Sequence, residues 1–250
     1  MNLEGTLTES TTRVDKTFAF KGEPKYAEIL VAGSVEAANL ANNHSRDYGA
    51  NSYTDTIANV EATGVTTFGY DRVAVKEVKG IKVGLVGIYE LADGLGRKQQ
   101  VIDNIQKVKD QGAQLIIVSF HWGTERVNYP DSIQKTLAHL AVDEGADLVL
   151  GHHPHVLQGI ETYQGKKIVY SLANFCFGGN KNPSDKDTMI FQQKFTFRNG
   201  ELIEDDVTTV IPCSVSSVSN KNNYQPTPLT GAAAERVMNR IQTYSAGITP

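Results

Sequence analysis

Five of the six histidines follow apolar segments that we expect to be buried strands. The segments and their histidines are 35–40 with His44, 115–120 with His121, and 147–150 with His152, His153 and His155. Because ligands bind in the crevice outside the carboxyl ends of the strands in open α/β sheets, three such loops can meet at one site. Imidazole binds Zn, Mn, Fe and related divalent ions, and carboxylate or amide oxygen from Glu4 or Asn43 would complete a mixed ligand set. The pattern predicts a divalent metal site.

Each histidine segment also has a structural interpretation. Alone, His121 beside Trp122 is typical of a core or hydrogen-bonded histidine, and Asn42-Asn43-His44 is typical of a turn, because Asn tolerates left-handed backbone. The run Gly151-His152-His153-Pro154-His155 is harder to explain in this way, since three histidines in five residues are an unusual concentration. The occurrence of all three segments at strand ends favours the metal site.

Other titratable residues are less informative. Asp47 and Glu125 either support the ligands or belong to the solvated surface, and His139 lies within a predicted helix, where a structural role is expected. The sequence has no glycine-rich phosphate loop and no Ser or Cys in a nucleophile-elbow context. The predicted metal site is therefore the best candidate for the chemistry of this sequence.

The elements that must position these residues alternate between helix and strand and then become all-β. Expected helices span 26–31, 51–62, 98–111, 130–144 and 231–243. Expected strands span 35–40, 73–78, 81–88, 115–120, 147–150, 156–163, 168–172, 189–197 and 202–211. Residues 213–230, rich in Ser, Asn and Pro, are expected to form an exposed loop before the last helix. This order predicts a layered α/β architecture, sheet packed on sheet, in a single domain over 1–250.

The composition excludes several classes of protein. The 250 residues carry a net charge of −4, which argues against a nucleic-acid partner, because binding to phosphate backbones draws on a basic surface. No apolar run approaches the ~18 residues that a membrane span needs. Cys176 and Cys213 form neither a disulfide framework nor a C-x-x-C pair. Residues 1–5 have neither a basic nor an apolar region, so we expect no signal peptide in this sequence.

Five motifs in a fixed order resemble a known family. They are Asn2-Leu3-Glu4-Gly5, Ala41-Asn42-Asn43-His44 with Asp47-Tyr48-Gly49, Ser119-Phe120-His121-Trp122-Gly123 with Glu125, Gly151-His152-His153-Pro154-His155-Val156, and Tyr170-Ser171-Leu172-Ala173-Asn174-Phe175. The combination resembles bacterial capsule synthesis proteins of the CapA type, which act in poly-γ-glutamate biosynthesis and have a calcineurin-like metallophosphoesterase fold. The resemblance covers roughly residues 1–200 and implies an α-β-β-α sandwich.

The resemblance also implies a role for each site residue. The implied metal ligands are Glu4, Asn43, His121, His153 and His155. His44 is implied as the catalytic histidine that faces the scissile phosphate. The positions implied to contact the substrate or to support the ligands are His152, Asp47, Glu125 and Asn174, and His152 is either a ligand or a substrate contact. Two divalent ions, Mn, Fe or Zn, would activate a water and stabilise the charge that develops on phosphorus.

One family feature is expected to be absent. Family members usually begin with a strand that ends in an Asp-bearing metal motif, and here we expect that strand and its carboxylate to be missing. One ion position then retains only Glu4 and His155, whereas Asn43, His121 and His153 supply the other. We therefore expect uneven metal binding, with at most one ion held well, and poor activity of this chain.

The favoured function is that of a metal-dependent hydrolase or modifier in capsule poly-γ-glutamate biosynthesis. Its expected partners are polyglutamate or a phosphorylated small molecule or polymer, together with other capsule-synthesis proteins. The alternative is a non-catalytic subunit for assembly or export of the polymer. The resemblance implies an extracytoplasmic site at the cell surface and a membrane-anchored parent protein, although we expect no anchor in this sequence.

Overall fold

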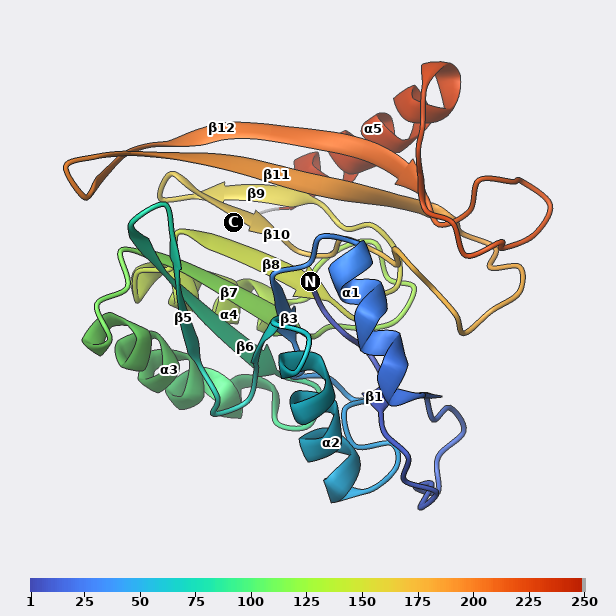
Figure 1. The fold of residues 1–250 in the computed structure, drawn as a ribbon. Coiled ribbons are helices and arrows are strands. Elements are labelled where there is room, and N and C mark those ends of the chain that lie inside the picture. Colours follow the sequence, from blue (N-terminus) through green and yellow to red (C-terminus); the bar gives the residue numbers. More distant parts are fainter. Residues whose placement is uncertain (249–250) are drawn as a thin grey trace.

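The computed structural model describes residues 1–248, which form an α-β-β-α arrangement (Figure 1). Helices α3 (Lys98–Asp110) and α4 (Ser132–Asp143) pack against a six-stranded sheet. A three-stranded antiparallel sheet follows, and α5 (Gly231–Ala246) packs at the far side. This confirms the layered α/β class predicted from the sequence.

The six-stranded sheet has the order β5-β6-β7-β8-β10-β9. Its strands are β5 (Ala74–Val78), β6 (Ile81–Tyr89), β7 (Leu115–His121), β8 (Leu148–His152), β10 (Lys166–Val169) and β9 (Ile160–Tyr163). The four inner strands are parallel, and the two outer strands are antiparallel to their neighbours. In this register Tyr89, His121 and His152 lie side by side at the carboxyl ends of three neighbouring strands.

The second sheet consists of β11 (Asp187–Arg198), β12 (Glu201–Ser214) and β13 (Thr227–Pro228). Strands β11 and β12 form a long hairpin above the first sheet in Figure 1. Apolar side chains of this hairpin, β10 and α5 pack in one cluster, which includes Val169, Met189, Val237 and Ile241. The core beneath α3 and α4 is larger and contains the stacked rings of Phe120 and Trp122, with centroids 4.3 Å apart.

The N-terminal part forms a smaller unit with its own apolar cluster. Its elements are β1 (Thr6–Leu7), β2 (Lys21–Gly22), the 3-10 helix η1 (Pro24–Ala27), α1 (Glu28–Ala32), β3 (Ala37–Asn39), α2 (Ala50–Glu61) and β4 (Thr66–Phe68). A second 3-10 helix, η2 (Gly94–Arg97), precedes α3. The segment that carries Glu4 is tied to β3, because Leu3 N donates to Asn39 O at 3.0 Å and Asn39 N donates to Met1 O at 2.7 Å.

Most predicted elements are present with shifted ends, and two predictions were wrong in part. The helix predicted over 130–144 begins at Ser132, because the Asp131 side chain caps it by accepting from Gln134 N at 2.8 Å. The strand predicted over 156–163 covers only Ile160–Tyr163, since the preceding residues run irregularly around the buried side chain of Gln158, which bonds to Gln134 and to Val127 O.

The prediction of an exposed loop over 213–230 was wrong only in part, since residues 217–221 are irregular and exposed, whereas the segment also contains strand residues and buried side chains. Strand β12 continues to Ser214 and pairs with β13. Asn222 is buried, and its amide donates to Phe177 O at 2.7 Å and to Asn180 O at 3.0 Å. Polar composition is misleading here because the side-chain amide replaces the hydrogen bonds of a regular element. The single-domain organisation over 1–250 stays a prediction.

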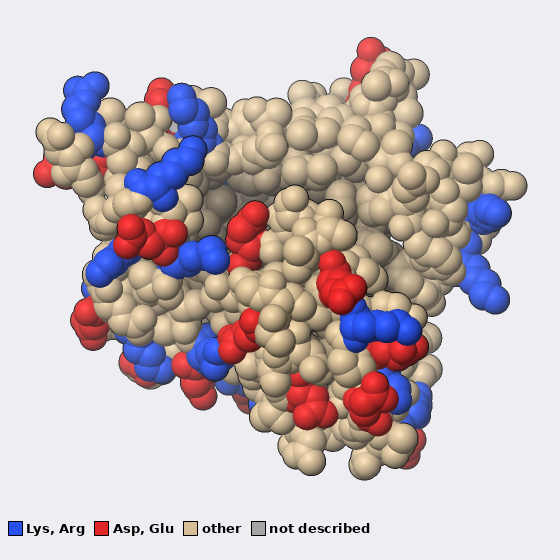
Figure 2. All heavy atoms as spheres, in the orientation of Figure 1, with Lys and Arg blue, Asp and Glu red and all other residues tan. Residues whose placement is uncertain are grey.

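Charged side chains of both signs are interspersed over the left and lower parts of the face in Figure 2. No helix among residues 1–248 has both the length and the apolar character that crossing a membrane requires.

Gly151 in β8 allows the close approach of three segments beneath the histidine run. A Cβ atom at this position would lie 1.9 Å from Tyr170 O and 2.5 Å from Trp122 Nε1, which itself donates to Tyr170 O at 2.9 Å.

We predict that Gly151→Ala lowers the free energy of unfolding by at least about 1–3 kcal/mol, because β8 must move away from its neighbours. Urea denaturation measures this loss. The matched control is Gly178→Ala, where nothing lies within 4 Å of the added methyl group, and an equal loss in both variants would contradict the prediction.

Candidate metal centre

A buried carboxylate oxygen lies at the centre of the predicted site. Glu4 Oε1 is 3.8 Å from His44 Nε2, 4.0 Å from His121 Nε2 and 3.8 Å from His155 Nε2. Within residues 1–248 this buried oxygen has no hydrogen-bond partner. The His153 ring completes the group, with its centroid 4.8 Å from that of His121 and 5.6 Å from that of His155. The structure therefore brings a carboxylate and four imidazoles together from segments far apart in the sequence.

Two of these imidazoles are oriented by a partner on Nδ1. His44 Nδ1 lies 2.7 Å from Asp47 Oδ2, and His155 Nδ1 lies 2.8 Å from Asn174 Oδ1. Because a carboxylate or amide oxygen only accepts, Nδ1 carries the hydrogen in both rings, and Nε2 presents its lone pair towards Glu4. Asp47 and Asn174 thus support the histidines, which is one of the roles that the resemblance implies for them.

Asn43 reaches the same group through its side chain. Its Oδ1 atom lies 2.9 Å from His121 Nε2. The opposite nitrogen of that fully buried ring, Nδ1, has no partner in the described part of the chain, and neither does His153 Nδ1. Buried polar atoms normally find partners, so these orphaned atoms mark a place where a bound group is expected.

The electrostatics favour neutral imidazoles around an uncompensated carboxyl group. Burial raises the pKa of Glu4, since few positive charges compensate its carboxylate. Burial lowers the pKa of His121 well below its ordinary value, that of His153 to about 4 and that of His152 to about 3. The pKa of His44 is also lowered by burial, against the opposing effect of Asp47. A neutral imidazole is the form that binds a metal ion.

The histidine run has an unusual backbone. His153 has φ of +100° and His155 has φ of +58°, in the left-handed region that residues with a side chain rarely adopt. Each such conformation costs about 1–3 kcal/mol, and conformations of this kind cluster at active sites and ligand clamps. The strained turn presents both rings to Glu4 from one short loop.

Two residues that sequence reasoning missed tie the loops of the site together. Lys16 Nζ donates to Asp47 Oδ1 at 2.7 Å and to Asn43 O at 2.9 Å. Asn42 Nδ2 donates to Leu3 O at 2.9 Å, and its Oδ1 accepts from His44 N at 3.0 Å. Nothing around Lys16 in the sequence signals this role, whereas Asn42 lies inside a recognised motif and was a findable candidate.

The remaining predicted residues lie around this centre in different ways. The Glu125 side chain is exposed, yet its carboxylate lies within 4.8 Å of ligand atoms of His153 and His155, so these three form a second group able to hold an ion. His152 belongs to neither metal-capable group. His139 lies apart, with its ring stacked on Tyr163 at 3.8 Å and Nε2 2.9 Å from Glu161.

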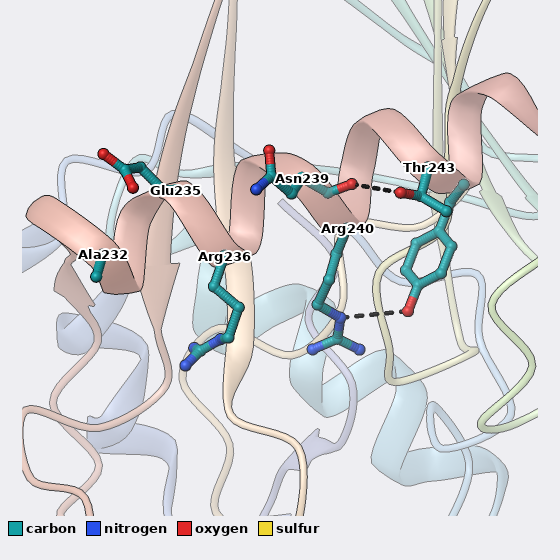
Figure 3. Close-up of a pocket in the computed structure, with 7 residues that line it drawn as sticks. Ala232, Glu235, Arg236, Asn239, Arg240 and Thr243 are labelled. Atoms are coloured by element: carbon teal, nitrogen blue, oxygen red, sulfur yellow. Dashed lines mark hydrogen bonds between the residues drawn. The ribbon is translucent and has the colours of Figure 1, made fainter.

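A hollow along α5 is a different feature (Figure 3). It has a volume of about 520 Å³, and none of the predicted site residues line it. Arg240 in its wall already donates to Tyr244 Oη at 3.2 Å and pairs with Asp185 at 2.6 Å. The chemistry of the chain is therefore expected at the histidine cluster.

Comparison with known proteins identifies relatives of the chain. The family described as "Bacterial capsule synthesis protein PGA_cap" matches residues 1–179. "Capsule biosynthesis protein CapA" of Bacillus anthracis is 31% identical over 242 residues, which are 88% of this chain and 56% of the relative. "PGA biosynthesis protein CapA" of Bacillus subtilis (strain 168) is 30% identical over 201 residues, or 70% of this chain and 52% of the relative.

A more distant relative has a differently worded name. A "Probable polyglutamine synthesis accessory protein" of Mycobacterium tuberculosis is 28% identical over 206 residues, which cover 70% of this chain and 54% of the relative. The chain thus spans about half the length of these relatives. The family match covers most of the chain, and with the two CapA relatives it shows that the chain belongs to the PGA_cap family of bacterial capsule synthesis proteins.

Proposed function

We propose that the chain is a metal-dependent hydrolase of capsule poly-γ-glutamate biosynthesis. The proposed ligands are Glu4, Asn43, His121, His153 and His155. His44 is proposed as the catalytic histidine, with Asp47 and Asn174 as supports of the two oriented imidazoles.

The observation that carries this proposal is the partnerless Oε1 atom of Glu4. It lies 4.0 Å from His121 Nε2 and 3.8 Å from His155 Nε2, which belong to two of the proposed ligands, and both distances are too long for hydrogen bonds. Two ligands of one ion are separated by at most twice the metal–ligand distance, about 4.2 Å for nitrogen and oxygen ligands. These separations therefore suit atoms that share a cation, and the mixed nitrogen and oxygen set suits Zn, Mn or Fe.

The two groups of residues that could hold an ion differ in the burial of their side chains. Glu4, His121 and His153 form the first group, and both of its histidines are buried. The second group uses His153 again, with His155 and the exposed Glu125. We infer one well-held ion at the first group and a weaker position at the second.

A bound divalent ion would supply Lewis acidity and lower the pKa of a coordinated water. The chain's own residues would supply orientation and proton transfer. His44 presents Nε2 to the centre, and Asp47 holds its Nδ1 hydrogen, so His44 can deliver or accept a proton there. Lys16 fixes Asp47 from the other side and keeps this pair in one orientation.

The names of the relatives support the substrate class and the location that we propose. The names of the Bacillus relatives place them in capsule and PGA biosynthesis. We propose polyglutamate, or a phosphorylated small molecule or polymer, as substrate, with other capsule-synthesis proteins as partners at the cell surface. A non-catalytic accessory subunit is the second candidate, which the name of the Mycobacterium tuberculosis relative favours. Hydrolysis of bis(4-nitrophenyl) phosphate by the metal-loaded chain separates these candidates, since an accessory subunit shows none.

Metal content is the first test. We predict about one tightly held divalent ion per chain after dialysis, measured by elemental mass spectrometry. The variant His121→Ala should lose it, because a fully buried ligand of the first group disappears. His139→Gln is the control, since His139 is bonded to Glu161 outside the cluster. Equal metal content in both variants, or two tightly held ions in the unmodified chain, would show that the ligand assignment is wrong.

The role of His44 requires a test in which metal and turnover are measured on the same sample. We predict that His44→Ala keeps its ion but hydrolyses the phosphodiester about 10²–10⁴-fold more slowly, as expected for loss of a general acid or base. If metal and activity disappear together, His44 belongs to the ligands instead.

The lowered histidine pKa values predict a pH dependence of the metal-free protein. His153 has a pKa of about 4 when folded, against 6.5 for an unperturbed histidine. Between these values the unfolded chain binds a proton that the folded chain does not, so stability is full above pH ~6.5 and falls as the pH drops towards about 4. Urea denaturation in EDTA should show this loss, and His153→Gln should make it shallower. An unchanged slope in that variant would contradict the prediction.

A further inference from the structure

Arg46 is an exposed arginine that the structure holds in place without a carboxylate. Its guanidinium carbon lies 4.8 Å from the centroid of the Tyr53 ring and 4.7 Å from that of Tyr70. Among the side chains that the structure describes, no Asp or Glu forms an ion pair with it, whereas Arg72, Arg97, Arg236 and Arg240 each have at least one. The positive charge of Arg46 is therefore available to an anion from outside the chain.

The two tyrosines hold this guanidinium in a defined place. Tyr70 Oη donates to Asn42 O at 2.8 Å, in the loop that also carries Asn43 and His44. The Tyr53 ring packs edge-on against Tyr70 at 5.6 Å. Burial raises the pKa of Tyr53, so its phenol stays neutral and does not compensate the guanidinium charge. The guanidinium meets the two tyrosines at their ring faces, and a ring face accepts no conventional hydrogen bond, so its N–H groups keep their capacity to donate.

A row of aromatic rings connects Arg46 with the proposed metal centre. The Tyr89 ring lies 6.2 Å from that of His121 and 6.1 Å from that of Tyr70. Tyr89 ends β6 beside His121 in the sheet register, and all three tyrosines are only partly buried. A ligand that lies along the carboxyl ends of the strands can thus contact the centre and Arg46 at once.

We propose that Arg46 binds an oxyanion of the substrate, a carboxylate or a phosphate, while the reacting group of the same molecule lies at the metal centre. This inference rests on the proposed function and adds to it a residue that binds the substrate. The planar fork of a guanidinium matches two oxygens of such a group. The Tyr89 and Tyr70 rings lie between His121 and Arg46, in steps of 6.2, 6.1 and 4.7 Å, so we expect the oxyanion and the reacting group on different parts of one molecule.

Calorimetric titration of the metal-loaded full chain tests this proposal. The probes are a γ-linked penta-glutamate for carboxylates and inorganic tripolyphosphate for phosphates, with free glutamate as the short control. Arg46→Gln should weaken binding of one probe about tenfold, as expected for loss of a charged hydrogen-bond pair. Binding of free glutamate and metal content should stay unchanged. The matched variant is Arg198→Gln, an equal change of charge at the exposed far end of β11, without an ion pair among the described residues.

The probe whose binding is weakened in Arg46→Gln shows whether Arg46 binds a carboxylate or a phosphate. Equal affinities in the unmodified chain and Arg46→Gln, an equal loss in Arg198→Gln, or no binding of either probe would overturn the inference. The phosphodiester assay is independent of these results. Metal-dependent hydrolysis with unchanged probe binding would leave the proposed function intact and reject Arg46, whereas weakened binding without hydrolysis would support Arg46 and reject the hydrolase.

Discussion

The candidate centre is arranged around one carboxylate oxygen, Glu4 Oε1, which has no hydrogen-bond partner among the described residues, whereas Oε2 accepts from Asn2 Nδ2 at 3.3 Å. Taking a charged oxygen such as Glu4 Oε1 out of water costs several kcal/mol unless opposite charge compensates it. Three imidazole nitrogens lie 3.8–4.0 Å from it, too far to hydrogen-bond, and those of His121 and His155 are near enough to share a cation with it. Asp47 and Asn174 set the tautomers of His44 and His155, and burial lowers the pKa of His153.

Backbone placement makes this arrangement possible. The parallel register puts His121 and His152 side by side. Just after them, His153 and His155 have left-handed backbone conformations, which turn the chain sharply at this point. Close packing beneath the run depends on Gly151, since any side chain there would meet Tyr170 O. The strain and the tight packing are compensated by the large apolar core under α3 and α4.

The sequence predicted the site best where the candidate ligands directly follow segments with a clear strand pattern. Histidines at the ends of apolar segments could be located because strand ends are readable and converge in α/β sheets. Contacts between segments far apart in the chain could not be predicted from the sequence. Lys16 lies in an irregular loop, and its ion pair with Asp47 exists only in the folded protein. The prediction over 213–230 was wrong in part for a related reason, because a buried amide such as Asn222 looks like a loop residue by composition.

The spacing of the proposed ligands along the chain has a consequence for how an ion would be acquired. Glu4, Asn43, His121 and the 153–155 turn belong to four segments that are far apart in the sequence and are neighbours in the folded structure. A chain that has not yet folded offers only the local pair of His153 and His155, because the other proposed ligands meet through long-range contacts. Selection among competing cations would then depend on the finished cavity, and a nascent chain would have little means of trapping the wrong one.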